Sequence, residues 1–335
     1  MTEYFSLALG AGTQNKAGDW LEVFYPKPIL YPARAMVEVI ARELGYNGGN
    51  QAINLSSAQC TLLSEGFRTA EFNELSVLAG QLASSKQPAV LTILQTDEAP
   101  VTTPGAYLKL HLLSHRLVKP QQVVLAGLFP LLPNVAWTDE GAIDLAELPE
   151  RQLAARVEGR TLHIHSVDKF PIMSNYVVPA GVRIADTARV RLGAYIGAGT
   201  TVMHEGFINF NAGTAGTSMV EGRISAGVFV GNGSDLGGGS STMGTLSGAG
   251  NVVISIGEGC LIGANAGVGI PLGDHCTVEA GLYLTAGLKV ALLSDDDKLL
   301  KVVKARELAN QPGLLFRRNS RTGAIECKAN KSLPH

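Results

Sequence analysis

The stretch VRIADTARVRLGAYIGAGTTVMHEGFI, residues 182–208, places an aliphatic residue at every sixth position. A strict six-residue period fits neither a helix nor an ordinary twisted sheet, and it is the signature of a parallel β-helix built from hexapeptides. Each hexapeptide forms one flat side of a triangular coil, with its aliphatic side chain inside. The period runs through Val178, Ile184, Val190, Ile196, Val202 and Ile208, resumes at Ile224, Val230 and Leu236, then at Ile256, Ile262 and Val268, and then at Leu272, Val278, Leu284 and Val290.

Glycine usage supports the same coil. Of the 39 glycines, 24 fall between Arg191 and Val290, and glycine lowers the steric cost of the turns at the corners. Two stretches lack the period, 209–218 and 232–242, and both are rich in glycine and small polar residues. We interpret them as insertions into the coil. Because a scaffold alone carries no chemistry, a functional site is expected beside them.

The length of 335 residues predicts two or three domains. We expect a mixed α/β domain at 1–170, the β-helix at 171–293 and a short C-terminal tail at 294–335, so the fold class is mainly β. Within the first domain, local patterns predict helices at 32–45 and 106–115, strands at 89–94 and 161–167, and a packed loop at 131–137.

The composition argues against several classes of function. A net charge of −2 lacks the basic patch of a nucleic-acid-binding protein, and no apolar run is long enough to span a membrane. The N-terminus lacks the basic and apolar regions of a secretory signal. The four cysteines are scattered without a C-x-x-C pair, which favours reduced thiols in a cytoplasmic protein over disulfides or a zinc site.

Three clusters carry candidate chemistry. They are MHEGFINFNAGT at 203–214, the pair Glu221 and Arg223, and the glycine loop at 237–242. Residues two apart on a strand share a face, so Glu221 and Arg223 form either a catalytic carboxylate with a substrate-binding cation or an exposed ion pair. The loop offers backbone N–H groups to an oxyanion or a phosphate, or it is only a tight corner.

The stretch from Tyr176 through Ser320, which contains these clusters, resembles the tetrahydrodipicolinate N-succinyltransferase family, most closely its long-chain actinobacterial and pseudomonad type. The matching strings are MHEGFINFNAGT (203–214), MVEGRISAG (219–227), MGTLSG (243–248), VEAGLY (278–283), VKAREL (303–308) and LFRRNS (315–320). They are far more specific than a hexapeptide repeat, and residues 1–170 fit the same family more loosely.

The resemblance implies a fold and a reaction. The coil is expected to be a left-handed β-helix, an exception to the usual right-handed crossover. The reaction expected is succinyl transfer from succinyl-CoA to cyclic tetrahydrodipicolinate, which with water gives N-succinyl-2-amino-6-oxopimelate and CoA. This is a step of lysine and diaminopimelate biosynthesis.

The resemblance also implies roles for residues. Glu221 becomes the catalytic carboxylate, either a general base for the attacking amine or a nucleophile that forms an acyl anhydride. Arg223 is expected to hold a substrate carboxylate through paired hydrogen bonds, and cationic groups of the tail are expected to suit the CoA phosphates. The residues implied in binding the acyl donor are Gly238, Ser241, Ala264, Glu279, Ala280, Gly287, Lys304, Arg317, Arg318, Asn319 and Ser320.

A magnesium ion at a threefold axis is a further implication. The family's ligands are a glutamate matching Glu205 and an aspartate just before the coil. Here the residue at the aspartate position is Ala188, and Asp186 lies two positions earlier. Magnesium needs oxygen ligands, so the site is either absent or rebuilt.

Three other functions remain open at this point. A hexapeptide acyltransferase for another amine, such as an amino sugar nucleotide, would use His204 as its base. A γ-type carbonic anhydrase needs three zinc histidines, whereas only His204 and His275 lie within the coil. A non-enzymatic scaffold would keep regular hexapeptides throughout.

Two expectations concern assembly and the tail. We expect a homotrimer with small-molecule substrates, because the family's pocket forms between neighbouring coils and cyclic symmetry closes such surfaces. We also expect the chain beyond Val290 to be mobile without CoA and separable from the coil, because charged residues bury little apolar area.

Overall fold

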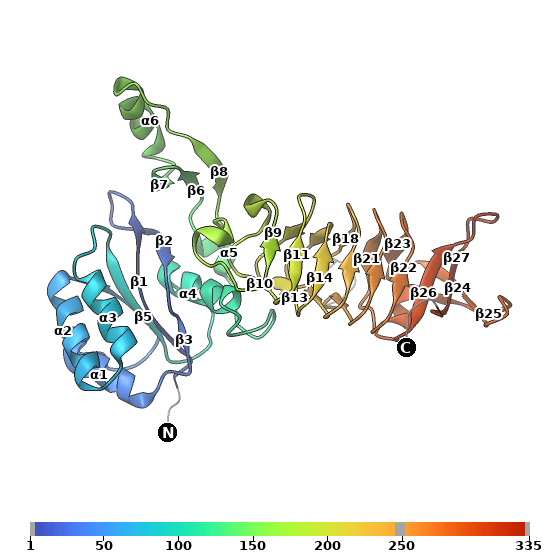
Figure 1. The fold of residues 1–335 in the computed structure, drawn as a ribbon, viewed down its shortest axis with the longest axis horizontal. Coiled ribbons are helices and arrows are strands. Elements are labelled where there is room, and N and C mark those ends of the chain that lie inside the picture. Colours follow the sequence, from blue (N-terminus) through green and yellow to red (C-terminus); the bar gives the residue numbers. More distant parts are fainter. Residues whose placement is uncertain (1–3, 245–251, 332–335) are drawn as a thin grey trace. The chain divides into compact units, whose positions relative to one another are not determined.

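The computed structural model describes residues 4–244 and 252–331. The chain divides into two compact units. The first contains the residues up to Leu117, 122–171 and 175–177, and the second contains 118–121, 172–174 and the chain from Val178 onward. Figure 1 draws the first unit mainly in blue and green and the second from yellow-green to red. Residues from 294 onward are therefore part of the same unit as the coil, not a separate tail.

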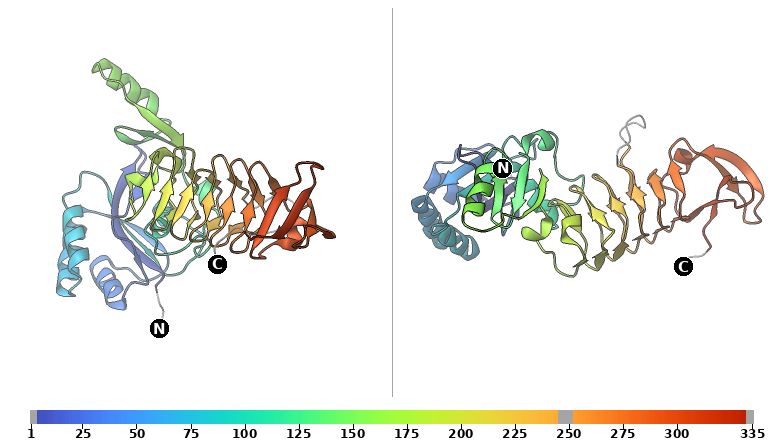
Figure 2. Two further views of the ribbon diagram at one scale, coloured as in Figure 1. Left: turned by 45° about the vertical axis from the view of Figure 1, so that its right-hand side comes forward. Right: turned by 90° about the horizontal axis from the view of Figure 1, so that it is seen from above.

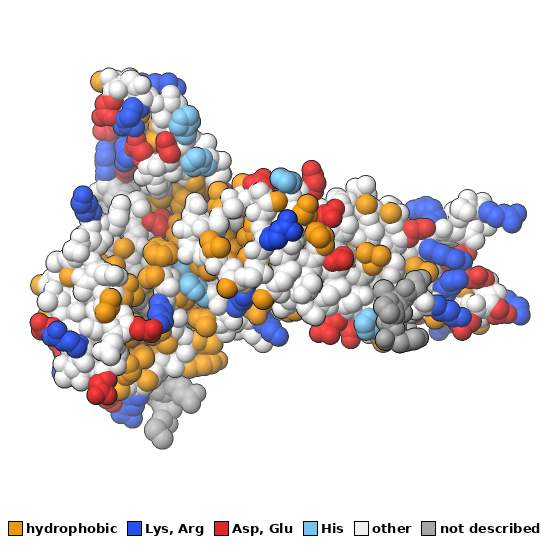
Figure 3. Space-filling model, viewed as in Figure 1, with side chains coloured by type: hydrophobic (Ala, Val, Ile, Leu, Met, Phe, Trp, Pro, Cys, Tyr) orange, Lys and Arg blue, Asp and Glu red, His pale blue; other side chains and the backbone are white. Residues whose placement is uncertain are grey.

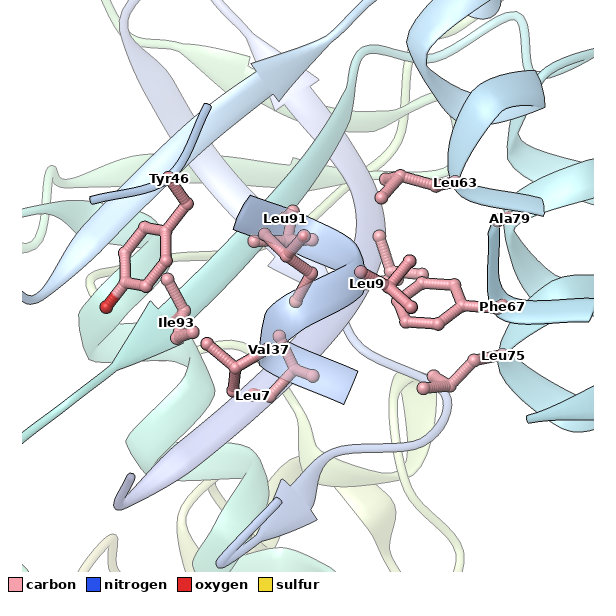
Figure 4. Close-up of a cluster of buried hydrophobic side chains, with 12 residues drawn as sticks. Leu7, Leu9, Val37, Tyr46, Leu63, Phe67, Leu75, Ala79, Leu91 and Ile93 are labelled. Atoms are coloured by element: carbon pink, nitrogen blue, oxygen red, sulfur yellow. The ribbon is translucent and has the colours of Figure 1, made fainter. Parts of the chain in front are cut away.

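An antiparallel sheet forms the centre of the first unit, in the order β2-β1-β5-β4 with β3 beside β1. The strands are β1 (Ser6–Gln14), β2 (Trp20–Phe24), β3 (Ile29–Leu30), β4 (Gln51–Leu55) and β5 (Ala89–Leu94). Leu7 and Leu9 from β1 and Leu91 and Ile93 from β5 belong to one buried cluster with side chains of three helices, shown in Figure 4. The helices are α1 (Arg34–Leu44), α2 (Ser57–Thr69) and α3 (Asn73–Leu82).

Most of the elements predicted in this unit are present. The helix expected at 32–45 is α1, which ends at Gly45 with a left-handed φ of 71°, as a glycine C-cap predicts. The strand at 89–94 is β5. The helix expected at 106–115 begins earlier, as α4 (Thr103–Ser114), because the Thr102 side chain accepts the N–H of Gly105 and caps it.

The loop predicted at 131–137 is wrong. That segment contains the end of α5 (Leu128–Leu131) and most of β6 (Val135–Thr138), the central strand of a second small sheet. Its partners are β7 (Gly141–Asp144) and β8 (Ile164–Asp168), and α6 (Leu148–Val157) lies between them in sequence. The prediction failed because Pro133 and Asn134 looked like turn residues, whereas they only precede the strand.

The second unit is the parallel coil that the six-residue period predicts (Figures 1 and 2). Its first side contains β10 (Ala194–Ile196), β13 (Ala212–Thr214), β16 (Phe229–Val230) and β19 (Ser255–Ile256). Its second side contains β9 (Arg183–Ile184), β11 (Thr200–Val202), β14 (Ser218–Val220), β17 (Asp235–Leu236), β20 (Leu261–Ile262) and β22 (Thr277–Val278). Its third side contains β12 (Phe207–Ile208), β15 (Arg223–Ile224), β18 (Ser241–Thr242), β21 (Gly267–Gly269) and β23 (Tyr283–Thr285).

The two predicted insertions, 209–218 and 232–242, are both wrong. Thr214 pairs with Ile196 and Thr242 with Ile224, so each continues a side of the coil, and both are fully buried. Their hydroxyls are satisfied inside: Thr214 Oγ1 lies 2.7 Å from Thr200 Oγ1, and Thr242 Oγ1 donates to the Arg223 carbonyl at 2.9 Å. A buried hydroxyl with a partner costs little, which is why a polar residue can hold an inward position.

Other features of the coil interrupt the period. Val220 and Ile224 both point inward although they are only four residues apart, and so do Val268 and Leu272. One long excursion separates β18 from β19. Residues 245–251 of this excursion, which include most of the MGTLSG string at 243–248, lie outside the described residues. Val178, predicted as the first inward residue, is 70% exposed.

The segment expected to be a mobile tail is packed onto the end of the coil. It forms β24 (Lys289–Leu293), β25 (Leu299–Lys304), the 3₁₀ turn Ala305–Leu308, β26 (Leu314–Arg318) and β27 (Ile325–Ala329). β26 runs parallel to β22, with Phe316 opposite Val278, and Phe316 is 0% exposed. The expectation failed because the charged residues of the segment alternate with apolar ones that complete the core. We call this segment, 289–331, the cap.

Candidate functional site

Six of the candidate residues fall at one corner of the coil. The turns between the second and third sides are 185–189, 203–206, 221–222, 237–240, 263–266 and 279–282. We call their stack the Glu221 corner. It brings together Glu205, Glu221, Gly238, Ala264, Glu279 and Ala280, which are far apart in sequence. The coil therefore gathers these six residues along a single edge.

Glu221 stands in the shortest of these turns and is half-buried. Its backbone N–H donates to the Leu236 carbonyl at 2.9 Å, and its own carbonyl accepts the N–H of Gly239 at 3.2 Å. A Cβ placed on Gly238 would lie 3.6 Å from Glu221 Oε2. The Glu221 carboxylate thus faces Gly238 in the next turn. The backbone of Glu221 is held by its two hydrogen bonds to Leu236 and Gly239.

Arg223 does not pair with Glu221. It is exposed at the start of β15, whereas Glu221 precedes the strand, so the two do not share a strand face as their spacing suggested. Arg223 Nη2 donates to Ser241 Oγ at 2.6 Å, on the adjacent strand. Among the described residues no ion pair joins Glu221 to any cation. The exposed ion pair considered from the sequence is therefore wrong.

The glycine loop offers one backbone donor, not several. The N–H groups of Gly237, Gly239, Ser240 and Ser241 donate to the carbonyls of Ile262, Glu221, Gly237 and Ala266, respectively. Within the described part of the chain, the N–H of Gly238 has no such acceptor. Gly239 has a φ of 68°, which an L side chain rarely adopts, so the turn needs glycine there. The remaining donor lies beside the Glu221 carboxylate.

The next two turns of this corner present a narrow edge. Ala264 and Ala280 are exposed, and a Cβ on Gly263 would lie 2.4 Å from the backbone nitrogen of Ala280, so the turns stack closely. Glu279 Oε2 accepts the backbone N–H of Arg318 at 2.6 Å, which ties the cap to this corner. An edge of alanines leaves room for an extended ligand along the coil.

Two other candidates lie at a different corner. Gly287 follows β23, and Lys304 ends β25; both are exposed. Ala305, next to Lys304, donates its N–H to the Leu288 carbonyl. This is the corner between the third and first sides, which we call the Gly287 corner. The residues implied in donor binding are therefore divided between two corners of one coil.

The string 317–320 is engaged within the cap. Arg317 Nε lies 2.9 Å from Glu326 Oε2, and Asn319 Nδ2 donates to the other oxygen of Glu326 at 2.7 Å. Asn319 also accepts two N–H groups of the turn that follows it. Arg318 and Ser320 are exposed. In Figure 3 this end of the coil carries Lys and Arg side chains interspersed with Asp and Glu, and the cationic side chains suit a phosphorylated ligand.

The implied magnesium pair is not present. Glu205 is exposed and Ala188 supplies no ligand. Asp186 Oδ1 accepts the N–H of Ala188 at 3.0 Å and caps a 3₁₀ turn. Within the described ranges, no group of three or more His, Cys, Asp or Glu side chains could hold a metal. His204, the base of the alternative acyltransferase, is an exposed turn residue.

Two titratable groups with shifted pKa values lie close together in the first unit. Burial lowers the pKa of His111 to about 3 and raises the pKa of Glu22. The two ring nitrogens of His111 lie 3.2 Å from the Tyr25 nitrogen and 2.8 Å from the Tyr107 carbonyl, and Glu22 accepts the hydroxyl of Tyr176 at 3.0 Å. His111 is thus neutral and engaged on both sides, which marks a structural cluster that the sequence patterns did not reveal.

Two family models match parts of the chain. Residues 132–171 match the model described as "Tetrahydrodipicolinate N-succinyltransferase middle", and residues 253–286 match "Hexapeptide repeat of succinyl-transferase". The first match covers the small β7-β6-β8 sheet, and the second covers the upper turns of the coil. No helix of the described residues is long and apolar enough to cross a membrane.

Whole-chain comparisons agree with the models. The chain is 66% identical to the 2,3,4,5-tetrahydropyridine-2,6-dicarboxylate N-succinyltransferase of Pseudomonas aeruginosa, over 98% of this chain and 95% of that relative. It is 60% identical to the protein of the same name from Vibrio cholerae, over 98% and 96%. A crystal structure from Campylobacter jejuni, described as a putative 2,3,4,5-tetrahydropyridine-2-carboxylate N-succinyltransferase, is 31% identical with a TM-score of 0.89 over 99% of this chain and 93% of that one.

Proposed function

We infer which residues do the chemistry from one premise: the chain belongs to the tetrahydrodipicolinate N-succinyltransferase family. It is an N-succinyltransferase with a left-handed β-helix and an N-terminal α/β domain, and it uses succinyl-CoA to succinylate tetrahydrodipicolinate in lysine and diaminopimelate biosynthesis. Family membership does not by itself assign the catalytic residues, the assembly or the location, and these are proposed from the geometry of the two corners.

We propose that Glu221 is the general base. Once water has added to the ring imine, the nitrogen is an amine that attacks the thioester carbon while Glu221 removes its proton. The negative charge on the thioester oxygen is stabilised by the N–H of Gly238, the loop donor that no described acceptor uses. The intermediate then expels the CoA thiolate, which takes the proton held by Glu221 and leaves as the thiol. The acylated carbinolamine opens by breaking its ring C–N bond, and its hydroxyl proton passes to the nitrogen, which gives the open-chain 6-oxo product. The observation that carries this assignment is that the Glu221 carboxylate faces Gly238, the residue whose N–H has no acceptor among the described residues. Thiol release from succinyl-CoA with and without tetrahydrodipicolinate tests the activity.

The residues at the implied magnesium site differ from those of the family. The resemblance implies two carboxylate ligands from each chain, whereas Ala188 stands at one position and the nearby Asp186 already caps a turn. Glu205 is the remaining carboxylate of the implied pair of ligands, and the second carboxylate of that pair is missing. The residues present therefore do not fit the site, and no step is derived through a metal ion.

The division of donor residues between two corners supports a trimer. One succinyl-CoA molecule that contacts Ala264 and Glu279 at the Glu221 corner, and also Gly287 and Lys304 at the Gly287 corner, is best accommodated between two copies. Three copies related by a cyclic axis complete three such sites.

We therefore expect light scattering to give the mass of three chains, with activity confined to that species. Dilution of the enzyme should lower its specific activity as the assembly dissociates. A stable monomer with full activity would contradict the shared site, because each chain would then contain every contact itself.

Lys304 is proposed to contact a phosphate of the donor. Replacing it by glutamine removes one charge-assisted contact, so the KM for succinyl-CoA should rise about tenfold while the KM for tetrahydrodipicolinate stays the same. Lys301→Gln is the matched control, because Lys301 is exposed on the same strand β25. Equal changes in the two variants would mean that Lys304 contributes only general surface charge.

A cytoplasmic location is part of the proposal. All four cysteines are free thiols, and each is buried. Reduced cysteines are typical of the cell interior, where coenzyme A thioesters serve as acyl donors.

A further inference from the structure

Three side chains form an outward column on the third side of the coil. Val190 pairs with Ile208, which sets Arg189 below Phe207, and Phe207 pairs in register with Arg223. Val190 and Ile208 are fully or almost fully buried, so their neighbours Arg189 and Phe207 face outward. The column therefore reads Arg189, Phe207, Arg223 over three successive turns of the coil.

Arg189 is held in place by neutral groups. Its Nε donates to the Gly206 carbonyl and its Nη2 to the Glu205 carbonyl, both at 3.2 Å. Its guanidinium carbon lies 5.7 Å from the centre of the Phe207 ring, a cation–π distance. The side chain is thus oriented by the turn above it and by the ring, and these contacts leave its positive charge uncompensated.

Neither cation of the column has an anionic partner in the chain. In the described ranges, neither Arg189 nor Arg223 forms an ion pair, although Glu205 and Glu221 stand at the adjacent corner. Arg223 donates instead to the Ser241 hydroxyl. Two uncompensated guanidinium groups on one face create a field that favours a doubly negative ligand.

The acceptor substrate is such a ligand, since its name in the relatives specifies a 2,6-dicarboxylate. We propose that Arg189 is a positioning residue for the second carboxylate of the acceptor, with Arg223 on the first. The two Cα atoms are two turns apart, about 10 Å at the usual spacing of adjacent strands. The Arg189 side chain already extends to the turn above it, to the carbonyls of Glu205 and Gly206, so its guanidinium and that of Arg223 can hold the two ends of one small dicarboxylate. Phe207 then supplies an apolar surface under the ring, and Glu221, two residues before Arg223, faces the reacting nitrogen.

This inference rests on the proposed function and extends it to acceptor specificity. A guanidinium binds a carboxylate through parallel N–H donors, and a site with two of them rejects a ligand that leaves one unpaired. A monocarboxylate of the same length should therefore bind much more weakly than the dicarboxylate.

The test measures acceptor binding in two ways. Arg189→Gln should raise the KM for tetrahydrodipicolinate by about tenfold or more, with the KM for succinyl-CoA nearly unchanged. In wild type, pimelate should inhibit competitively against the acceptor at a concentration at least about tenfold lower than heptanoate, which has one carboxylate. In the variant the two inhibition constants should become similar, and Arg189→Lys should restore part of the difference.

Arg183→Gln is the matched control, because Arg183 is an exposed arginine of the same turn but on the second side of the coil. It should behave as wild type. A loss of binding that affects pimelate and heptanoate equally would show that Arg189 only supports the turn at Glu205. An unchanged acceptor KM, or a wild-type enzyme without preference for pimelate, would also overturn the inference. Failure of the proposed function is distinct, since wild type would then release no thiol.

Discussion

Replacement of Glu221 by glutamine is expected to lower turnover by about a hundredfold or more, the usual effect of losing a general base. The change is nearly isosteric, and the backbone contacts of residue 221 to Leu236 and Gly239 do not involve its side chain. The unfolding midpoint and the affinity for CoA should therefore stay close to wild type. Steady-state thiol release at saturating concentrations of both substrates measures the effect.

Glu258→Gln is the control for this experiment, because Glu258 is a glutamate of the coil at the corner between the first and second sides, away from the Glu221 corner. It should retain full turnover. If Glu221→Gln kept a near wild-type rate with an unchanged pH profile, the carboxylate would have no part in proton transfer. An acyl-enzyme trapped on wild type with succinyl-CoA alone would instead favour the anhydride role of Glu221.

The sequence predicted the scaffold well because one physical constraint repeats along it. Each side of the coil must bury one side chain, so the inward residues recur at six-residue intervals wherever the sides are regular. The prediction failed at Thr214 and Thr242 for a related reason. Both occupy inward positions, but their hydroxyls are satisfied by partners on neighbouring strands, which only the folded coil brings within reach.

The site was harder to predict than the fold. The family resemblance identified Glu221 and Gly238, yet which residues share a corner depends on the number of residues in each turn. The number of residues in a turn changes at two places, the four-residue step from Val220 to Ile224 and the long excursion before Ile256. Because of these changes, the sequence spacing did not reveal that Lys304 and Ala264 lie at different corners. Arg189 escaped notice because its relation to Phe207 and Arg223 appears only in the register of three successive turns.

The cap should be essential for the stability of the coil. Phe316 is 0% exposed and stands over Val278, where the next inward residue of the second side would be. Phe316→Ala leaves a cavity at the end of the core, so the free energy of unfolding should fall by about 3–5 kcal/mol. Leu300→Ala, at a residue of β25 that is 61% exposed, should change it little. Chemical denaturation followed by circular dichroism measures both.

Truncation after Val290 extends the same argument. It removes β25, β26, β27 and most of β24, and so exposes Val278 together with the edges of the last coil turns. Uncovered strand edges and apolar surface favour association with other chains, so the truncated protein should unfold at a lower temperature and aggregate. A mobile tail predicts the opposite, an intact trimer that has lost only affinity for succinyl-CoA. A truncated protein with a wild-type unfolding midpoint would restore that interpretation, because Phe316 would then contribute nothing to the core that it closes.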